Sequence, residues 1–264
     1  MNFCADRKYK RVRVLPKWKI TLEYDGSAFC GWQSQPNGNG VQNLVEHAIA
    51  QIDGGKRSVS VAGRTDAGVH ALGQVCSATL EKDWKPHRLL SGLNSFFRKE
   101  GKVSAIRAEL MPDDFDARFS AKARKYLYII QNRKPPLSVT KGRAWHVVFD
   151  LDLEKMREAA RELIGTHDFT TFRDVQCQAK SPIKTLDVFD IANVQTPNGE
   201  QIHCTFEAPS FLHRQVRSMV GSVYDVGRGR WEVGDLVVAL KSRDRDKCGR
   251  VAPPEGLYLT KVEY

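Results

Sequence analysis

Two hydrophobic periodicities alternate along the first hundred residues, and this alternation restricts the fold more than any other feature. Residues 18–24 read Trp-Lys-Ile-Thr-Leu-Glu-Tyr, with an apolar side chain at every second position, which predicts a strand with one buried face. Over residues 41–53 the apolar side chains recur at helical spacing, and Gly54-Gly55 follow as a stop signal. Further strands are predicted at 57–61, 74–79 and 103–110, and a second helix begins at Pro86. This order of elements predicts an α+β fold.

The second half of the chain carries the same two kinds of pattern after a break at Pro135-Pro136. We predict helices at 153–163, 212–223 and 234–240, a hairpin of strands at 184–194 and 201–208, and a last strand that ends at Tyr264. We therefore expect a basic N-terminal extension over 1–17, an α+β half over 18–135 and a second α+β half over 136–264. The extension is either a solvated tail or an arm on nucleic-acid phosphate.

A glycine-bounded loop, Gly63–His70, lies between two of the predicted strands and carries a carboxylate, Asp66. Loops held by a rigid sheet are common places for reactive groups. Arg64 is two residues away, so in extended chain both side chains point to one face, where the arginine would keep the carboxylate ionised or hold a phosphate. The alternative is a β-turn in which Asp66 bonds its own backbone and Arg64 is solvated.

The charge balance favours a polyanionic partner, with nucleic acid as the leading candidate. The chain has 41 Lys and Arg against 31 Asp and Glu, a net charge of +10. Its six cysteines form no Cys-x-x-Cys pair, so we expect reduced thiols in a cytoplasmic protein and neither a zinc site nor a disulfide framework. We also expect no secretory signal and no membrane span, since no apolar run approaches about 18 residues.

Four other positions each allow a structural and a functional interpretation. Trp32 either caps the core or stacks on a nucleic-acid base. Tyr126 either belongs to a half-exposed sheet face or lies under a flipped base. His167-Asp168 is either structural or a metal-binding or acid–base pair, and the lack of a third ligand nearby favours the structural role. Arg217, beside an apolar helical stripe, is either solvated or paired with Asp66 or a phosphate.

Four strings of the chain, taken in order, resemble the sequence signatures of the TruA-type tRNA pseudouridine synthases. They are Phe29-x-Gly31-Trp32-Gln33, Gly63–His70, Arg124-x-Tyr126-x-Tyr128 and Phe211–Gly221. The resemblance extends over roughly residues 18–264. The extension before Trp18 is a departure for which the family offers no clear role.

The resemblance implies both a fold and a set of site residues. The fold is α+β, with two similar halves whose mainly antiparallel sheets join across a central RNA-binding cleft and whose helices lie on the outer faces. Asp66 is the implied catalytic residue, and the implied substrate-binding residues are Tyr126, Arg64, Arg217 and Leu257. We also expect RNA contacts from Trp32, Gln33, His70, Lys122, Arg124, His167 and His213.

The implied reaction converts uridine to pseudouridine in the anticodon stem-loop of tRNA, with positions 38–40 as the expected targets, in a homodimer. The N1–C1′ bond breaks and the uracil rejoins through C5, so no cofactor or metal is required, and the base must be flipped out. Whether Asp66 attacks C1′, attacks C6 or removes the 2′ proton stays open. The alternatives are a non-catalytic RNA-binding protein and an RNA nuclease that uses His70 or His167.

Overall fold

A nine-stranded sheet is the central feature of the computed structural model, which describes residues 14–34 and 38–264. Its strands are β1 (Lys17–Tyr24), β2 (Ser60–Val61), β3 (His70–Thr79), β4 (Val103–Met111), β5 (Ala123–Asn132), β6 (Trp145–Val147), β9 (Val188–Thr196), β10 (Gly199–Ala208) and β11 (Leu257–Glu263). They are ordered β4-β1-β3-β11-β5-β10-β9, with β2 beside β3 and β6 beside β5. Two more strands, β7 (Gly165–Asp168) and β8 (Ile183–Leu186), form a small separate sheet.

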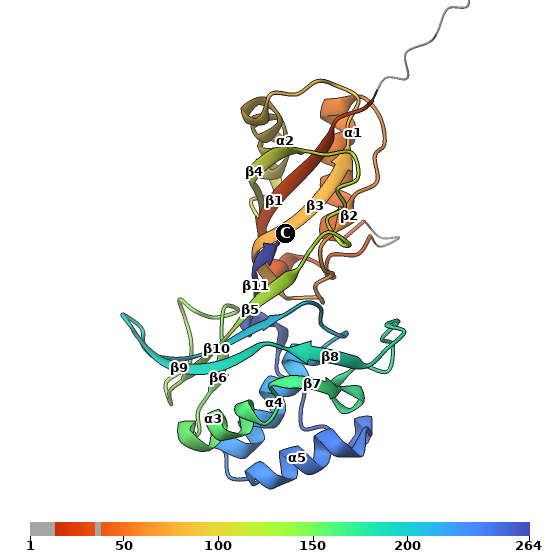
Figure 1. Ribbon diagram of the computed structural model, residues 1–264. Helices are drawn as coiled ribbons and strands as arrows, with labels where there is room; N and C mark the ends of the chain where they lie inside the picture. Colours follow the sequence, from red (N-terminus) through yellow and green to blue (C-terminus); the bar gives the residue numbers. More distant parts are fainter. Residues whose placement is uncertain (1–13, 35–37) are drawn as a thin grey trace, which may run out of the picture.

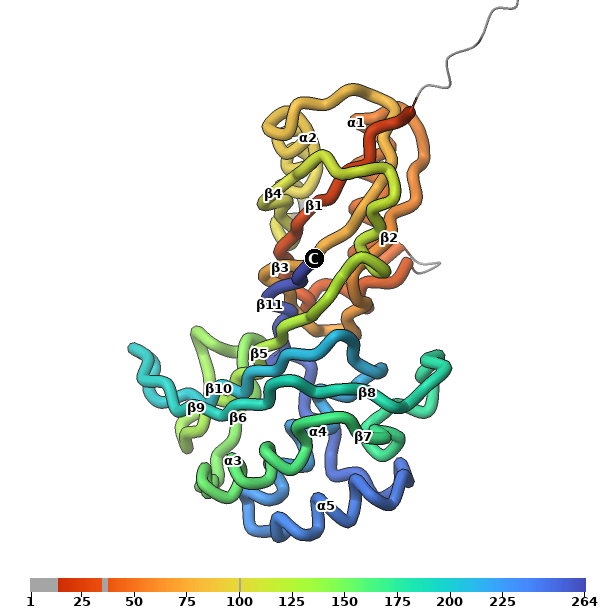
Figure 2. Tube along the Cα trace, in the orientation of Figure 1, coloured from red at the N-terminus to blue at the C-terminus, as the bar shows by residue number. Residues whose placement is uncertain are grey.

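Strand β11, the last of the chain, lies at the centre of the sheet and joins its two ends. It runs parallel to β3, where Tyr258 pairs with His70, and antiparallel to β5, where Leu257 pairs with Tyr128. Figures 1 and 2 show β11 between the upper part of the molecule and the lower part. Apart from β11–β3 and β5–β6, the strand pairs of the described residues are antiparallel, which confirms the predicted α+β fold with a mainly antiparallel sheet.

The helices of the described residues fall into two groups at opposite ends of the sheet (Figure 1). Helices α1 (Val41–Asp53) and α2 (Pro86–Glu100) lie beside β1, β3 and β4, whereas α3 (Leu153–Arg161), α4 (Gln215–Gly227) and α5 (Val233–Ser242) lie beyond β9 and β10. Helix α1 buries Val41, Val45, Ala48 and Ile49, which share one face at helical spacing. It has the predicted bounds, and Gly54 ends it in the left-handed conformation.

The strand predicted at 74–79 begins four residues earlier, at His70, and two other predicted strands differ from the structure in their pairing. Only Ser60–Val61 of the predicted strand 57–61 pairs with β3. The predicted strand 184–194 is interrupted at Asp187, so that β8 pairs with β7 and β9 pairs with β10. The domain boundary after residue 135 stays a prediction, and the sheet itself is continuous there, because β5 pairs with both β11 and β10. Residues 1–13 of the predicted extension lie outside the described residues, and Lys17 begins β1.

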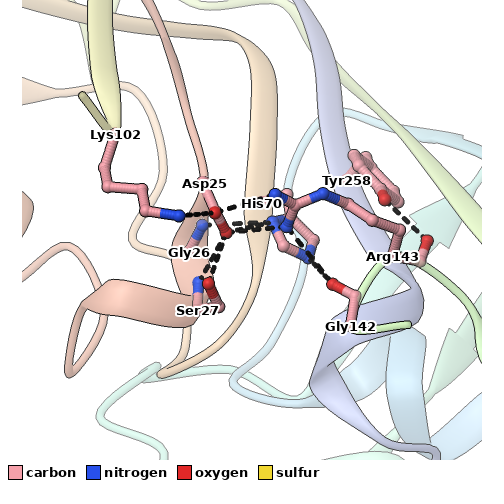
Figure 3. Close-up of polar contacts among 8 residues, drawn as sticks. All are labelled: Asp25, Gly26, Ser27, His70, Lys102, Gly142, Arg143 and Tyr258. Atoms are coloured by element: carbon pink, nitrogen blue, oxygen red, sulfur yellow. Dashed lines mark hydrogen bonds and ion pairs between the residues drawn. The ribbon is translucent and has the colours of Figure 1, made fainter. Parts of the chain in front are cut away.

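Asp25, a carboxylate at the end of β1, pairs with basic side chains from distant parts of the chain (Figure 3). Arg143, in the connection that leads to β6, donates from Nη1 and Nη2 to the two oxygens of Asp25 at 2.8 Å each. Lys102, in the turn before β4, donates to Oδ2 at 2.8 Å. Such a bidentate pair fixes geometry as well as charge. The contacts attach the β5–β6 connection to the end of β1.

His70, the first residue of β3, lies beside this cluster (Figure 3). Its Nδ1 accepts the Gly26 N–H at 3.1 Å, so the ring proton is on Nε2, which donates to the Gly142 carbonyl at 3.0 Å. Tyr258 of β11 stacks on the imidazole at 4.8 Å between centroids and donates to the Arg143 carbonyl. The cluster therefore holds the start of β3 against the connection between β5 and β6.

We predict that Asp25→Asn lowers the free energy of unfolding by about 1–3 kcal/mol at neutral pH, because the amide leaves Arg143 and Lys102 without an anion. Hydrogen bonds from Arg143, with help from Lys102, hold the pKa of Asp25 far below its usual range. The carboxylate thus stabilises the fold above the unfolded-state pKa, and this contribution is lost as the pH falls. Urea unfolding should show a difference between wild type and variant at pH 7 that shrinks below about pH 4. Asp83→Asn, at an exposed position, is the control. An equal loss of unfolding free energy in both variants would contradict the stabilising role assigned to Asp25.

Candidate active site

A cleft of about 1500 Å³ opens beside the Gly63–Val69 loop. Its walls come from the β2–β3 loop, from β5, from the start of β11 and from the segment that leads into α4. The cleft brings together eight residues singled out from the sequence: Gln33, Arg64, Asp66, Arg124, Tyr126, His213, Arg217 and Leu257.

Hydrogen bonds on both sides hold the loop that carries Asp66. The Thr65 hydroxyl shares a 2.7 Å hydrogen bond with the Tyr24 hydroxyl, and the Trp32 N–H donates to the Thr65 carbonyl at 3.0 Å. Gln74 of β3 donates from its amide to the Gly63 carbonyl at 2.8 Å. The loop turns sharply at Asp66, whose carbonyl accepts the N–H of Val69. The loop is therefore a turn that is fixed from three directions, and the side chain of Asp66 bonds Arg217 and not its own backbone.

Two glycines allow other backbone segments to contact this loop closely. Gly31 has a φ of +97°, and a Cβ there would lie 2.7 Å from the Thr65 carbonyl oxygen. At Gly26 a Cβ would lie 2.0 Å from the Val69 carbonyl oxygen, so any side chain there would clash with the backbone. Both ends of the Asp66 loop thus depend on backbone-to-backbone packing that only glycine permits.

The side chain of Asp66 is held from the opposite wall of the cleft. Arg217 Nη1 donates to Oδ2 at 2.8 Å, and Arg217 Nε donates to the Ala252 carbonyl at 2.8 Å. His213 Nε2 lies 3.3 Å from Oδ1. The predicted partner Arg64 is exposed and, among the described residues, forms no ion pair. Of the two arginines that the sequence offered as partners, Asp66 therefore pairs with Arg217, 151 positions away, and not with Arg64.

Two opposing effects set the charge of Asp66. Burial alone would raise the pKa of its carboxyl, because only 17% of the side chain is exposed. Hydrogen bonds and charge from His213 and Arg217 outweigh burial and bring the pKa below its ordinary value. The result is a shielded but ionised carboxylate, which is the form needed for a nucleophile or a base.

Tyr126 is buried except for 8% of its surface, and the edge of Phe211 packs against it at 5.2 Å between ring centroids. Burial raises the pKa of the phenol well above its usual value, so the hydroxyl is neutral. Leu257, buried at the start of β11, also lines the cleft. An aromatic ring and an aliphatic side chain on the wall of a charged cleft are suited to hold a flat, largely apolar group such as a base.

Four of the expected RNA contacts lie outside the cleft lining. Trp32 is fully buried in the core, which favours its structural interpretation and corrects the expected stacking role, since no ring face is open. His70 is 2% exposed within the Asp25 cluster. His167 lies in β7, where its Nε2 contacts the Ile164 carbonyl at 3.0 Å. Lys122 is exposed just before β5 and is not among the residues that line the cleft.

Arg124 lines the cleft, but its guanidinium is bonded to the backbone. Nε and Nη2 donate to the Ala62 carbonyl, Nη1 donates to the Ala121 and Pro209 carbonyls, and Nη2 also donates to the Arg118 carbonyl. An arginine has five N–H donors, so all of them are occupied. The side chain ties β5 to the strand-like segment before Asp66, and it has no donor left for a phosphate.

Comparisons with known proteins show the family to which the chain belongs. A family model for tRNA pseudouridine synthase matches residues 20–120 and 159–264. The chain belongs to this family. It is 51% identical over 250 residues to a tRNA pseudouridine synthase A of Nitrobacter winogradskyi, covering 95% of this chain and 96% of that protein. It is 50% identical over 251 residues to a tRNA pseudouridine synthase A of Brucella ovis, covering 95% and 98%.

A more distant similarity relates 92% of this family member to 48% of a chain in the crystal structure of a Cbf5-Nop10-Gar1 complex. The TM-score is 0.37 at 9% sequence identity, too low to support a structural argument. Over the part of the chain that the structure describes, no helix is both long enough and apolar enough to cross a membrane. In the same residues, no group of three or more His, Cys, Asp or Glu side chains is arranged to hold a metal ion.

Sequence reasoning missed several residues of this tRNA pseudouridine synthase family member that contribute to the cleft. Arg118 and Arg214 line it, and buried Asp174 accepts from Arg214 Nη1 at 2.8 Å. Arg214 has a φ of 58°, in the left-handed region that non-glycine residues rarely adopt. The lysine and arginine at 56 and 57 also face the cleft. The adjacent Lys56 and Arg57 could be seen in the sequence, whereas the contact between Asp174 and Arg214 depends on folding.

We predict that Arg124→Gln acts on stability and not on nucleic-acid affinity. Glutamine cannot reach the four carbonyls that Arg124 joins, so the free energy of unfolding should fall by about 2–4 kcal/mol. Arg118→Gln is the matched control, because Arg118 is exposed on the same cleft. It should keep the melting temperature and weaken tRNA binding. The reverse result, with weaker binding and unchanged melting in Arg124→Gln, would contradict the role assigned to Arg124.

Proposed function

We propose that the protein isomerises uridine to pseudouridine in tRNA, with Asp66 as its catalytic residue. The observation that carries this proposal is the ionised carboxylate of Asp66, held by Arg217 in a basic cleft of a chain that belongs to the tRNA pseudouridine synthase family. The relatives at 51% and 50% identity are named tRNA pseudouridine synthase A, an isomerase activity.

The geometry supports the chemistry that this isomerisation needs. One step must break N1–C1′ and another must form C5–C1′, with no net oxidation or hydrolysis. A carboxylate that stays ionised while partly shielded from water is suited to attack a carbon atom or to remove a proton. Arg217 holds Oδ2 of Asp66 by a 2.8 Å hydrogen bond, whereas Oδ1 lies 3.3 Å from His213 Nε2. Attack at C1′, attack at C6 and removal of the 2′ proton all fit this arrangement.

The target uridine is expected to leave its stack and enter the cleft. Tyr126 and Leu257 line the cleft with a ring and an aliphatic group that can pack against the uracil. Arg64 is exposed on the same loop as Asp66, where it can fill the space left by the flipped base or hold the adjacent phosphate. We propose these three as substrate-binding residues together with Arg217.

The proposed substrate is the anticodon stem-loop of tRNA, with positions 38–40 as targets. A net charge of +10 and the exposed Arg64, Arg118 and Arg214 around the cleft supply cations for the phosphate backbone. We further propose a homodimer that holds one tRNA across both subunits and a cytoplasmic location. These finer points rest on the sequence resemblance.

The two alternative functions have less support. A nuclease that uses His70 or His167 would need the imidazole beside the bound RNA, but His70 is enclosed in the Asp25 cluster and His167 lies in β7. A purely RNA-binding protein would not need a shielded carboxylate held by an arginine. Product analysis separates all three: a nuclease shortens RNA, a binder leaves it unchanged, and a synthase rearranges uridine without changing its mass.

We predict that Asp66→Asn abolishes pseudouridine formation while folding and most of the tRNA affinity are kept. The amide has nearly the shape of the carboxylate but is a poor nucleophile and base. Site mapping of pseudouridine in tRNA after incubation with pure protein gives the measurement. Asp190→Asn, an exposed change of the same charge on β9, should behave as wild type. Product formation near the wild-type rate in Asp66→Asn would refute the catalytic assignment.

Tyr126 provides a second test, because two substitutions separate its ring from its hydroxyl. Tyr126→Phe keeps the stacking ring, worth roughly 1–3 kcal/mol per base, and should retain most of the binding contribution. Tyr126→Ala should reduce the single-turnover rate far more than tRNA affinity, since phosphate contacts elsewhere supply most of the affinity. Melting curves of both variants control for stability. An unchanged single-turnover rate in Tyr126→Ala would contradict a substrate-binding role for Tyr126.

A further inference from the structure

His213 lies between two carboxylates at the wall of the cleft. Its Nε2 is 3.3 Å from Asp66 Oδ1, and its Nδ1 is 3.7 Å from Asp174 Oδ1. The side chain is 34% exposed and lines the cleft. A ring with an acid at each nitrogen is placed to carry a proton on both.

The backbone around His213 is held so that this position is fixed. The Asp174 N–H donates to the His213 carbonyl at 3.0 Å, and Gln215 accepts the Leu212 N–H through its side chain at 2.8 Å. Arg214 adopts the left-handed conformation between them, which is strained for a non-glycine residue. The surrounding contacts compensate this strain, and strain of this kind tends to occur at functional sites.

The charges that face His213 come from three segments of the chain. Asp66 belongs to the β2–β3 loop, Asp174 to the segment that follows β7, and Arg214 and Arg217 to the start of α4. Each carboxylate already has one arginine at 2.8 Å, Arg217 on Asp66 and Arg214 on Asp174. A protonated His213 therefore gives Asp66 a second cation, which unlike an arginine can lose its charge by deprotonation.

We propose that His213 is a positioning residue for Asp66: its protonated form holds Oδ1, and loss of the Nε2 proton, with the other proton kept on Nδ1 toward Asp174, frees this oxygen for the substrate. This inference rests on the proposed function, in which Asp66 is catalytic. The contact with Asp66 raises the pKa of His213 above its usual 6.5, although partial burial opposes the shift. The proton passes to solvent as the pH rises, while Arg217 keeps Asp66 ionised and in place.

The titration of His213 can be followed without any turnover. NMR of the imidazole resonances in the full-length protein should give a lower pKa for His213 in Asp66→Asn than in wild type, because the variant removes the main group that favours the protonated ring. His146, whose Nε2 contacts the Arg133 carbonyl away from the cleft, is the internal control and should be unaffected. The same His213 pKa in both proteins would overturn the proposed contact, whatever the catalytic result.

The effect on the reaction is read from the pH dependence of kcat/KM for tRNA. In wild type the value should rise by about tenfold per pH unit on the acid side of the His213 titration and then level off. His213→Gln cannot titrate, so its profile should be flat over the same range, whereas His146→Gln should keep the wild-type profile. A wild-type slope in His213→Gln would overturn the proposal. Failure of the proposed function would appear differently, as absence of pseudouridine in wild type.

Discussion

The ion pair between Arg217 and Asp66 is the contact on which the rest of the site depends. Shielding a carboxylate from water is costly unless a cation compensates, and here the cation comes from a helix 151 residues further along the chain. A second bond from Arg217 to the Ala252 carbonyl prevents the guanidinium from following the substrate or turning into solvent. The catalytic candidate is therefore ionised and fixed only when the loop after β2 and the start of α4 have been brought together.

Strand β11 makes that assembly possible, and it uses both of its faces to do so. Successive side chains of a strand point to opposite faces. Leu257 accordingly lines the cleft, whereas Tyr258 stacks on His70 and donates to the Arg143 carbonyl. Because β11 pairs with β3 on one side and β5 on the other, the last strand of the chain joins the Asp66 loop to the part of the sheet that carries Tyr126.

The sequence was most informative where the decisive interactions are local. Helix α1 has its predicted bounds because the apolar spacing and the glycine stop act within a few residues. Residues 184–194 were predicted as one strand, but β8 and β9 pair with different partners, and such a choice depends on tertiary pairing that a periodic pattern does not contain. The Asp66 loop was likewise identified from a local signal, namely its own glycines and their spacing.

Side-chain partners were the least predictable part of the site. Both Arg64 and Arg217 were offered as partners of Asp66, and only the folded structure shows that Arg217 forms the ion pair. Trp32 and His70 belong to strings that resemble RNA-contact motifs, yet both are buried, and their bonds hold the backbone near Asp66 in place. A motif residue can thus be required for the site without contacting the substrate, and only burial and bonding distinguish the two cases.

The arginines of the cleft show how this distinction changes the meaning of the net charge. Arg124 uses all five donors on backbone carbonyls, so its charge stabilises the scaffold and offers no hydrogen bond to RNA. Arg217 donates one hydrogen bond to the Ala252 carbonyl and one to Asp66. Exposed Arg64 donates none to the described part of the protein. The number of basic residues around the cleft therefore overstates the number of phosphate contacts. The slope of tRNA affinity against salt concentration should therefore reflect the arginines whose N–H donors are not bonded within the protein, and not the net charge of +10.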